Sequence, residues 1–188
     1  GQKRNTYMSY ARAWLGDADD GHPFVGIVAD SGYALAPDAQ LDWALFQDLI
    51  GPSIGAASTD RLKAALELVT GEPLSGVDAS KYEWAQSVKT EIIAAVADVA
   101  HEVARRATMA GDPRTAAWAA TKGLAAEPIN EALWRDAITA AWQSGIPGRA
   151  RDLISRCHTA IEDLGDLEDE TITLINDIIK GERKRAYA

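Results

Sequence analysis

The hydrophobic residues of this chain recur three and four positions apart from about Leu41 almost to the C-terminus, which is the spacing of amphipathic helices. This pattern predicts helices over residues 41–50, 59–70, 81–109, 131–144, 148–164 and 168–180. A further helix is expected to begin at Pro113, with Asp112 as its N-cap, and Asn130 is expected to cap the next one. We expect Gly181 to end the last helix and residues 182–188 to form a frayed basic tail.

The N-terminal part follows a different pattern. Residues 3–15 carry Tyr7, Ala11 and Trp14 on one side of a predicted helix, which Gly16 ends. Two short β-type runs follow, Phe24–Val28 and Tyr33–Leu35, on either side of an Asp-Ser-Gly turn. Such runs around a tight turn predict a small β-hairpin. The chain is therefore expected to be mostly α, with one hairpin near its start.

The helical part contains a motif that occurs twice, 34 residues apart. Ala110-Gly111-Asp112-Pro113 opens the first copy and Ser144-Gly145-Ile146-Pro147 opens the second. Ala116 then aligns with Ala150, and Gly123 with Cys157. A 34-residue period with small residues at fixed positions is typical of tetratricopeptide helix pairs, although two amphipathic helices can also resemble each other by chance. The repeat predicts that Gly123 lies where helices cross closely.

Composition and charge narrow the possible functions. The chain has 188 residues, a net charge of −9 and one cysteine, so it has no internal disulfide and fits a reducing compartment. An acidic balance argues against broad, non-specific binding to nucleic acids or anionic membranes. The longest apolar helical run, Ile92–Ala97, is too short to cross a bilayer, so we expect a cytoplasmic protein. Because the chain begins inside a predicted helix, it is expected to be a piece of a longer protein.

No catalytic constellation is found in the sequence. His22, His101 and His158 form no metal-binding signature with neighbouring ligand-type residues, and the Gly51–Gly55 stretch lacks the Gly-Lys-Ser/Thr ending of a phosphate loop. Cys157 occupies a small-residue position of the repeat, which favours a buried structural thiol over a nucleophile. We therefore expect neither an enzyme nor a metal site nor a bound cofactor.

Several motifs recur in an order that resembles a known family. These are Glu72-Pro73-Leu74-Ser75-Gly76, Tyr82-Glu83-Trp84-Ala85, Ala110-Gly111-Asp112, Pro128 with Leu133-Trp134, and Leu164-Gly165 with Glu170-Thr171. Together they resemble the bacterial transcriptional activator domain, the tetratricopeptide-like region of the Streptomyces antibiotic regulatory protein family. The resemblance covers about residues 41–180 and implies a tetratricopeptide-like helical array.

The N-terminal segment resembles a part of another module that precedes the activator domain in that family. Residues 7–16 and the hairpin ending at Leu35 are similar to the recognition helix and wing of an OmpR-like winged helix. The resemblance implies two domains, a partial winged helix over 1–37 and the activator domain over 38–188. Lys3, Arg4 and Arg12 are the candidate nucleic-acid-binding residues. Because residues 1–37 contain these three basic residues against four aspartates, a balance of −1, any DNA contact is expected to need the complete parent protein.

The resemblance implies that the activator domain works in an actinobacterial-type transcriptional regulator through protein contacts or dimerisation. In tetratricopeptide-like arrays the first helix of each pair lines the concave side. We therefore expect a partner groove that includes Arg105, Trp134, Arg135 and Trp142, because aromatic and Arg anchors carry much of the energy of interfaces. Two alternatives remain open: the tryptophans belong to the core, and the C-terminal helix 168–180 fills the groove. A scaffold or sensor module that does not bind DNA is the alternative function.

Overall fold

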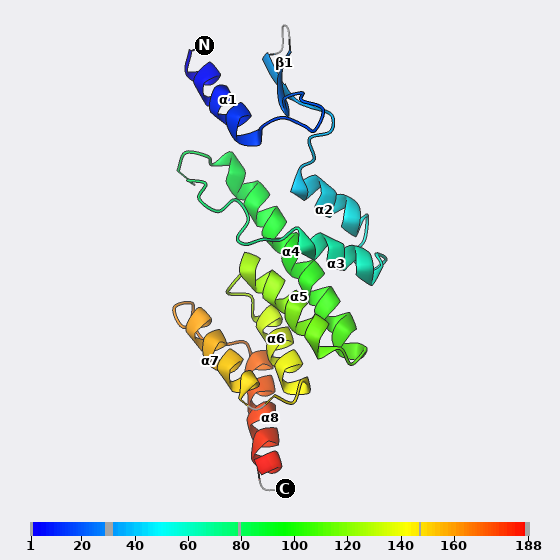
Figure 1. The fold of residues 1–188 in the computed structure, drawn as a ribbon. Helices are drawn as coiled ribbons and strands as arrows, with labels where there is room; N and C mark the ends of the chain where they lie inside the picture. Colours follow the sequence, from blue (N-terminus) through cyan, green and yellow to red (C-terminus); the bar gives the residue numbers. More distant parts are fainter. Residues whose placement is uncertain (1, 29–31, 79, 147, 187–188) are drawn as a thin grey trace. The chain divides into compact units, whose positions relative to one another are not determined.

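The computed structural model describes residues 2–28, 32–78, 80–146 and 148–186. Within these residues it contains eight helices and one two-stranded antiparallel sheet, so the expected fold class, a mostly helical array with a small helix-plus-hairpin segment at the N-terminus, is confirmed (Figure 1). The elements are α1 (Gln2–Leu15), β1 (Val25–Val28), β2 (Gly32–Leu35), α2 (Asp42–Ile50), α3 (Thr59–Glu67), α4 (Trp84–Met109), α5 (Pro113–Ala126), α6 (Glu131–Gln143), α7 (Arg149–Ile161) and α8 (Asp169–Ala186). They group into two compact units, Gly1–Leu45 and Phe46–Ala188.

The first unit contains α1 and the predicted hairpin. Strands β1 and β2 pair antiparallel, with Val25 opposite Leu35 and Val28 opposite Gly32, and the turn that joins them lies outside the described residues. The His22 ring lies between the carboxylates of Asp20 and Asp38 and thereby ties the segment before β1 to the segment after β2. These hydrogen bonds, first the one that Asp38 accepts, raise the pKa of His22 above its ordinary value.

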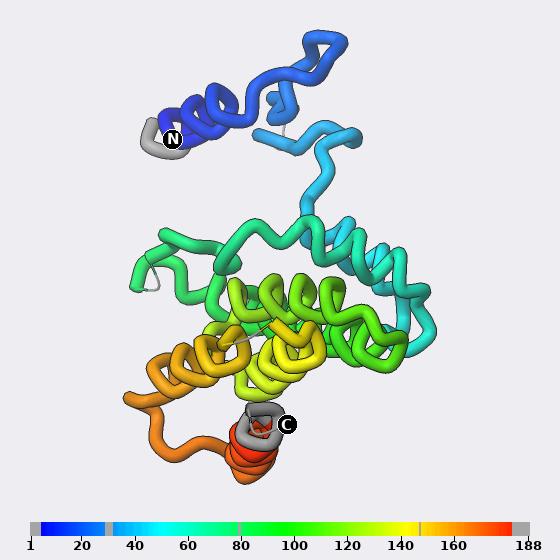
Figure 2. The backbone as a smooth tube through the Cα atoms, turned by 60° about the horizontal axis from the view of Figure 1, so that its bottom comes forward, coloured from blue at the N-terminus to red at the C-terminus, as the bar shows by residue number. Residues whose placement is uncertain are grey.

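The second unit is a stack of helices in which consecutive helices from α3 to α7 pack against each other. Helix α4 packs against α5, α5 against α6 and α6 against α7, and Figure 2 shows α4 and α5 lying side by side. Contacts also join α4 to α6 and α6 to α8. Thus α6 lies between α4 and α8 and contacts both of them. This is the arrangement expected when helix pairs stack and bury a continuous core.

The 34-residue repeat is visible in the backbone as well as in the side chains. Gly111 and Gly145, which are equivalent in the two copies, both have a left-handed conformation, with φ values of 71° and 67°. Glycine is favoured there because other residues are strained at positive φ. Asp112 and Asn130 cap α5 and α6 as predicted, by accepting hydrogen bonds from the backbone N–H groups of Thr115 and Leu133.

Small residues allow the first helix pairs to approach closely. The crossing of α4, α5 and α6 is centred on Gly123, where a Cβ atom would lie 2.7 Å from both the Ala100 Cβ and the Leu133 Cδ1 atoms. Both neighbours are fully buried. A side chain at position 123 would therefore need the space that these atoms occupy. The predicted crossing at Gly123 is confirmed, and Cys157, at the equivalent position of the second copy, is also buried.

A second core joins α6, α7 and α8. It contains Trp134 and Ile138 of α6, Ile154 and Cys157 of α7, and Ile175 and Ile178 of α8. Helix α8 thus buries its apolar stripe against the last helix pair. Contrary to expectation, α8 does not end at Gly181 but continues to Ala186. A Cβ at residue 181 would lie 2.8 Å from the Trp142 ring, so glycine lets the helix pass this tryptophan.

The start of α4 also differs from expectation. The helix begins at Trp84 rather than near Lys81, and the Trp84 side chain is 71% exposed although it falls on the predicted apolar stripe. The first fully buried residues of the stripe are Val96 and Val99, near the middle of α4. Periodicity identifies a stripe, but it does not show how far the neighbours extend along it.

Candidate partner-binding face

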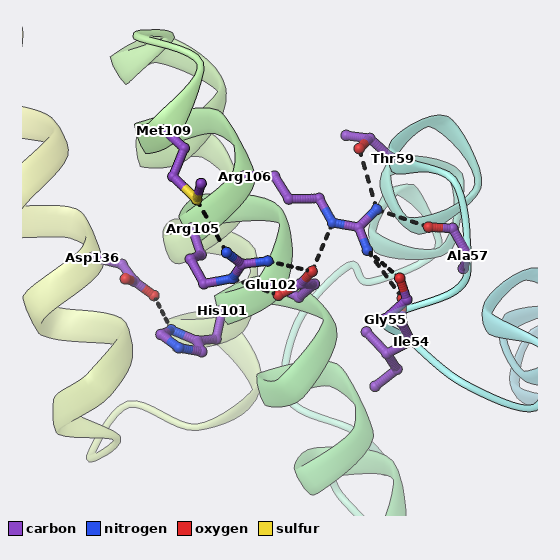
Figure 3. A network of polar contacts seen from close by, with 10 residues as sticks. All are labelled: Ile54, Gly55, Ala57, Thr59, His101, Glu102, Arg105, Arg106, Met109 and Asp136. Carbon is purple, nitrogen blue, oxygen red and sulfur yellow. Dashed lines mark hydrogen bonds and ion pairs between the residues drawn. The ribbon is translucent and has the colours of Figure 1, made fainter.

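A network of polar contacts surrounds Glu102 in the second half of α4 (Figure 3). Its carboxylate accepts hydrogen bonds from Arg105 Nε at 2.8 Å and from Arg106 Nε at 2.7 Å. The two arginines then point to different places. Arg106 extends toward the loop between α2 and α3, whereas Arg105 remains on the surface of α4.

Arg106 holds the loop before α3 through backbone oxygens. Its guanidinium donates to the carbonyls of Ala57 at 2.7 Å, Gly55 at 3.1 Å and Ile54 at 3.2 Å. Because only about a fifth of the side chain is exposed, water competes weakly for these bonds. The planar guanidinium fork can satisfy several acceptors at once, which a lysine ammonium does with less directional fit. Arg106 therefore positions the loop against α4.

The pKa of the Glu102 carboxyl is lowered to about 2 by its hydrogen bonds to Arg105 and Arg106, and burial partly opposes this shift. The pKa of Glu102 in the folded state lies below its ordinary value of 4.5. Its contribution to stability is therefore complete above the unfolded-state pKa and is lost as the pH falls through the folded-state pKa. We expect Glu102→Gln to destabilise the protein by about 2 kcal/mol at pH 7. The difference should shrink between about pH 5 and pH 2.

Urea denaturation of both proteins over this pH range measures the effect. Glu91→Gln, an exposed position on the same helix, is the matched control and should change stability little at any pH. A Glu102→Gln difference that stays constant down to pH 2 would contradict the assigned role of the carboxylate.

A second polar contact joins α4 to α6. His101 Nδ1 lies 2.7 Å from Asp136 Oδ2, and the aspartate is largely buried. Burial raises the pKa of Asp136, while the hydrogen bond that Asp136 accepts from the His101 ring raises the pKa of His101. The two residues are 35 positions apart, which is close to the repeat period. Alternate helices therefore meet here at nearly equivalent positions of consecutive repeats.

Next to this contact, α4 presents an exposed arginine and an exposed methionine. The Arg105 guanidinium donates to Glu102 and lies 3.1 Å from the Met109 sulfur. Met109 is 77% exposed and Arg105 is about half exposed. We refer to His101, Arg105 and Met109 of α4, together with Asp136 of α6, as the α4–α6 face. The face combines the Arg105 guanidinium, which Glu102 holds in place, with the flexible apolar side chain of Met109.

The model of one protein family, described as the bacterial transcriptional activator domain, matches residues 53–174, which is well over half of the chain. The chain belongs to the bacterial transcriptional activator domain family. Searches of curated proteins and of solved structures found no match. The family is one of transcription regulation and not of enzymes. The match includes the Glu102 network, the α4–α6 face and both copies of the repeat.

The activator domain places the four predicted partner residues in different environments. Trp134 is 5% exposed, lies in the core with α7 and α8, and donates its indole N–H to the Pro128 carbonyl at 2.8 Å. Trp142 packs against Gly181. Arg135 pairs with Glu168 and donates to Thr171 Oγ1 at 2.9 Å, so it joins α6 to α8. Arg105 alone among the four presents its charge on the α4–α6 face.

The partner role of Trp134, Arg135 and Trp142 stays a prediction. The Trp134 ring is buried, and its only donor is used within the chain. The C-terminal helix is also not spread across the α4–α6 face. Among the described residues it packs on α6 and buries Ile175 and Ile178 in the core shared with α7. Partner binding through Arg105 stays a prediction.

The candidate nucleic-acid residues lie in the first unit, before the family match begins. The side chains of Lys3 and Arg4 lie outside the described residues. Arg12 is partly buried and borders a shallow hollow together with Asp17 and Tyr33. An aspartate at the same hollow offsets its charge. The resemblance of α1 and the hairpin to a winged helix also stays a prediction.

Cys157 is fully buried, and burial raises the pKa of its thiol to about 11, so the thiol stays protonated at neutral pH. Among the described residues, no three His, Cys, Asp or Glu side chains gather closely enough to hold a metal ion. No helix in the described part is both long and apolar enough to span a membrane.

Sequence reasoning missed two parts of the polar network. The contacts of Arg106 go to main-chain oxygens about 50 residues away, and any residue type can supply a carbonyl there, so no sequence pattern could have revealed them. The contact between His101 and Asp136 did leave a signal. Extending the 34-residue period to the segment before the first copy brings His101 within one position of Asp136.

Proposed function

We propose that this activator domain regulates transcription by binding a protein partner on the α4–α6 face. The observation that carries the proposal is the pair formed by Arg105 and Met109, which lie side by side on the exposed side of α4. Glu102 fixes the Arg105 guanidinium, which lowers the entropy lost on binding. Methionine adapts to irregular apolar surfaces, and arginine is enriched among the residues that dominate interfaces.

The partner surface that fits this face has a carboxylate for Arg105 and an apolar group for Met109. Arg105 keeps donor capacity beyond its bonds to Glu102, and a guanidinium pairs well with carboxylates.

A transcription regulator acts where the genome is, so we place the protein in the cytoplasm. We also assign the chain to the Streptomyces antibiotic regulatory protein family, with 1–37 as a partial winged helix and 38–188 as the activator domain. The order helix, hairpin and helical array supports this assignment.

The proposal predicts that the chain changes transcription when it is tethered next to a promoter. We would fuse the 188-residue chain to an unrelated DNA-binding domain and measure a bacterial reporter gene that carries the cognate site. Because recruitment by protein contacts needs no DNA contact of the chain itself, reporter output should change several-fold relative to the DNA-binding domain alone. Equal output from the fusion and from the DNA-binding domain alone would contradict the proposal.

The chain itself should bind duplex DNA no better than non-specifically. Its net charge is −9, and Arg12 of the first unit lines the same hollow as Asp17. Binding of this kind depends on phosphate contacts and weakens steeply with salt. Fluorescence anisotropy on random and genomic duplexes at several salt concentrations tests this. A sequence-selective complex that resists salt would favour direct DNA reading by residues 1–37.

A further inference from the structure

The chain contains two methionines, and the structure places them in different surroundings. Met109 is the last residue of α4 and is 77% exposed, and residues 110–112 after it are exposed as well. Met8 lies in α1 and is partly buried. The one cysteine, Cys157, is fully buried, and burial keeps its thiol protonated. Of the sulfur atoms in these side chains, the one in Met109 is therefore the most open to a dissolved oxidant.

The Met109 sulfur has a hydrogen-bond donor beside it. Arg105 Nη1 donates to this sulfur at 3.1 Å, while Nε and Nη2 of the same guanidinium donate to Glu102 at 2.8 Å and 2.9 Å. The two bonds to Glu102 fix the plane of the guanidinium, so its third nitrogen is aimed at the sulfur. A thioether sulfur is a weak acceptor with two lone pairs. Arg105 thus engages one lone pair and leaves the other one free.

We propose that Met109 is a site of reversible oxidation by peroxides, and that its sulfoxide weakens partner binding on the α4–α6 face. In this reaction the free lone pair of the sulfur attacks one oxygen of hydrogen peroxide, so an S–O bond forms and the O–O bond breaks. The departing oxygen takes up the proton of the oxygen that stays on sulfur and leaves as water. Sulfur loses two electrons and peroxide gains them, so peroxide is the only other reactant that the oxidation needs.

The sulfoxide would change the property of Met109 on which the proposed function depends. Oxidation converts a flexible apolar side chain into a polar, chiral one. An apolar group of the partner would then face a dipole that it cannot satisfy. The sulfoxide oxygen would also compete with the partner's carboxylate for the Arg105 guanidinium. This loss of binding rests on the proposed function, whereas the oxidation itself does not.

The Arg105 contact should make the oxidation stereoselective. Oxygen can be added at either lone pair of the sulfur, and the two products are epimers that different methionine sulfoxide reductases repair. Because Arg105 engages one lone pair, peroxide should attack the other, and one epimer should be in excess. Arg105→Ala removes the guanidinium and should bring the two epimers toward equal amounts. A methionine that is merely exposed would show no such dependence on residue 105.

Peptide mapping by mass spectrometry tests the oxidation on the purified 188-residue chain. In dilute hydrogen peroxide, Met109 should form sulfoxide several-fold faster than Met8, and this difference should disappear in the urea-unfolded chain. Each reductase, applied separately to the digested peptides, measures one epimer at Met109 in the parent and in Arg105→Ala. Circular dichroism should show parental helix content in the variant. Equal oxidation rates of the two methionines in the folded chain, or the same epimer ratio with and without Arg105, would overturn the proposal.

The tethered reporter tests the effect on regulation, in a bacterial host that lacks these reductases. A short pulse of hydrogen peroxide should bring the reporter transcript of the parent fusion several-fold closer to that of the DNA-binding domain alone under the same pulse. Met8→Leu is the control and should respond like the parent. Met109→Leu keeps an apolar side chain that peroxide cannot oxidise, so its transcript should be the same before and after the pulse.

The outcomes separate this inference from the proposed function. A parent fusion that does not respond to the pulse, or a Met109→Leu fusion that responds like the parent, would overturn the regulatory role of the oxidation. A parent fusion that leaves transcription unchanged even without peroxide would contradict the proposed function, and with it the regulatory role. Oxidation at Met109 is decided in that case by the mass spectrometry alone.

Discussion

Gly123→Leu should lower the free energy of unfolding by about 3 kcal/mol, at the upper end of the range for overpacked cores. The first added atom already comes within 2.7 Å of Ala100 Cβ, which is fixed to the backbone of α4 and cannot rotate away. Leucine adds further atoms between α4, α5 and α6, all of which belong to the same buried crossing. Relief therefore requires the helices to move apart.

Urea denaturation followed by circular dichroism measures this change. Gly71→Leu is the matched control, because no atom lies within 4 Å of a Cβ at position 71 and its φ is ordinary. The control should stay within about 0.5 kcal/mol of the parent. Equal stability of Gly123→Leu and the parent would contradict both the crossing and the repeat register.

The second large effect is expected at Arg106. Replacement by Ala should cost about 2–3 kcal/mol, since it removes hydrogen bonds to Glu102 and to three carbonyls of the loop before α3. Lys should recover only part of this stability, because it lacks the planar fork that reaches several acceptors.

Arg105→Ala is the control for this change, because the two arginines are adjacent and share Glu102. Arg105 is more exposed, and its hydrogen bonds go to Glu102 and Met109 of its own helix, so its loss should cost less than about 1 kcal/mol. Thermal and urea unfolding of the three variants give the comparison. Arg106→Ala and Arg105→Ala with the same stability would show that the loop contacts contribute little.

The parts of the fold that could be predicted from the sequence depend on local or periodic rules. The helices follow the spacing of apolar residues, the caps at Asp112 and Asn130 follow from side chains that accept backbone N–H groups, and Gly123 follows from the repeat. The predicted end of the last helix at Gly181 is wrong. A glycine often ends a helix, but here it serves another purpose. Gly181 instead packs against Trp142 of another helix.

The candidate site was less predictable because its residues depend on tertiary contacts. Trp134 and Arg105 both fit the composition of interfaces, but the sequence does not show that α7 and α8 cover one of them and leave the other exposed. The sequence shows which side chains are present, but it does not show which of them the fold brings together at a surface.

The claim that the α4–α6 face carries the regulatory contact is tested most directly by one pair of charge reversals in the tethered reporter. Arg105→Glu changes an exposed arginine on the face, and Arg114→Glu changes an exposed arginine at the start of α5, outside the face. We predict that Arg105→Glu brings reporter output close to that of the DNA-binding domain alone, as expected for the loss of an anchor worth about 2 kcal/mol, while Arg114→Glu retains the parental output. Equal output from the two variants, with both folded as judged by circular dichroism, would contradict the assignment of the face.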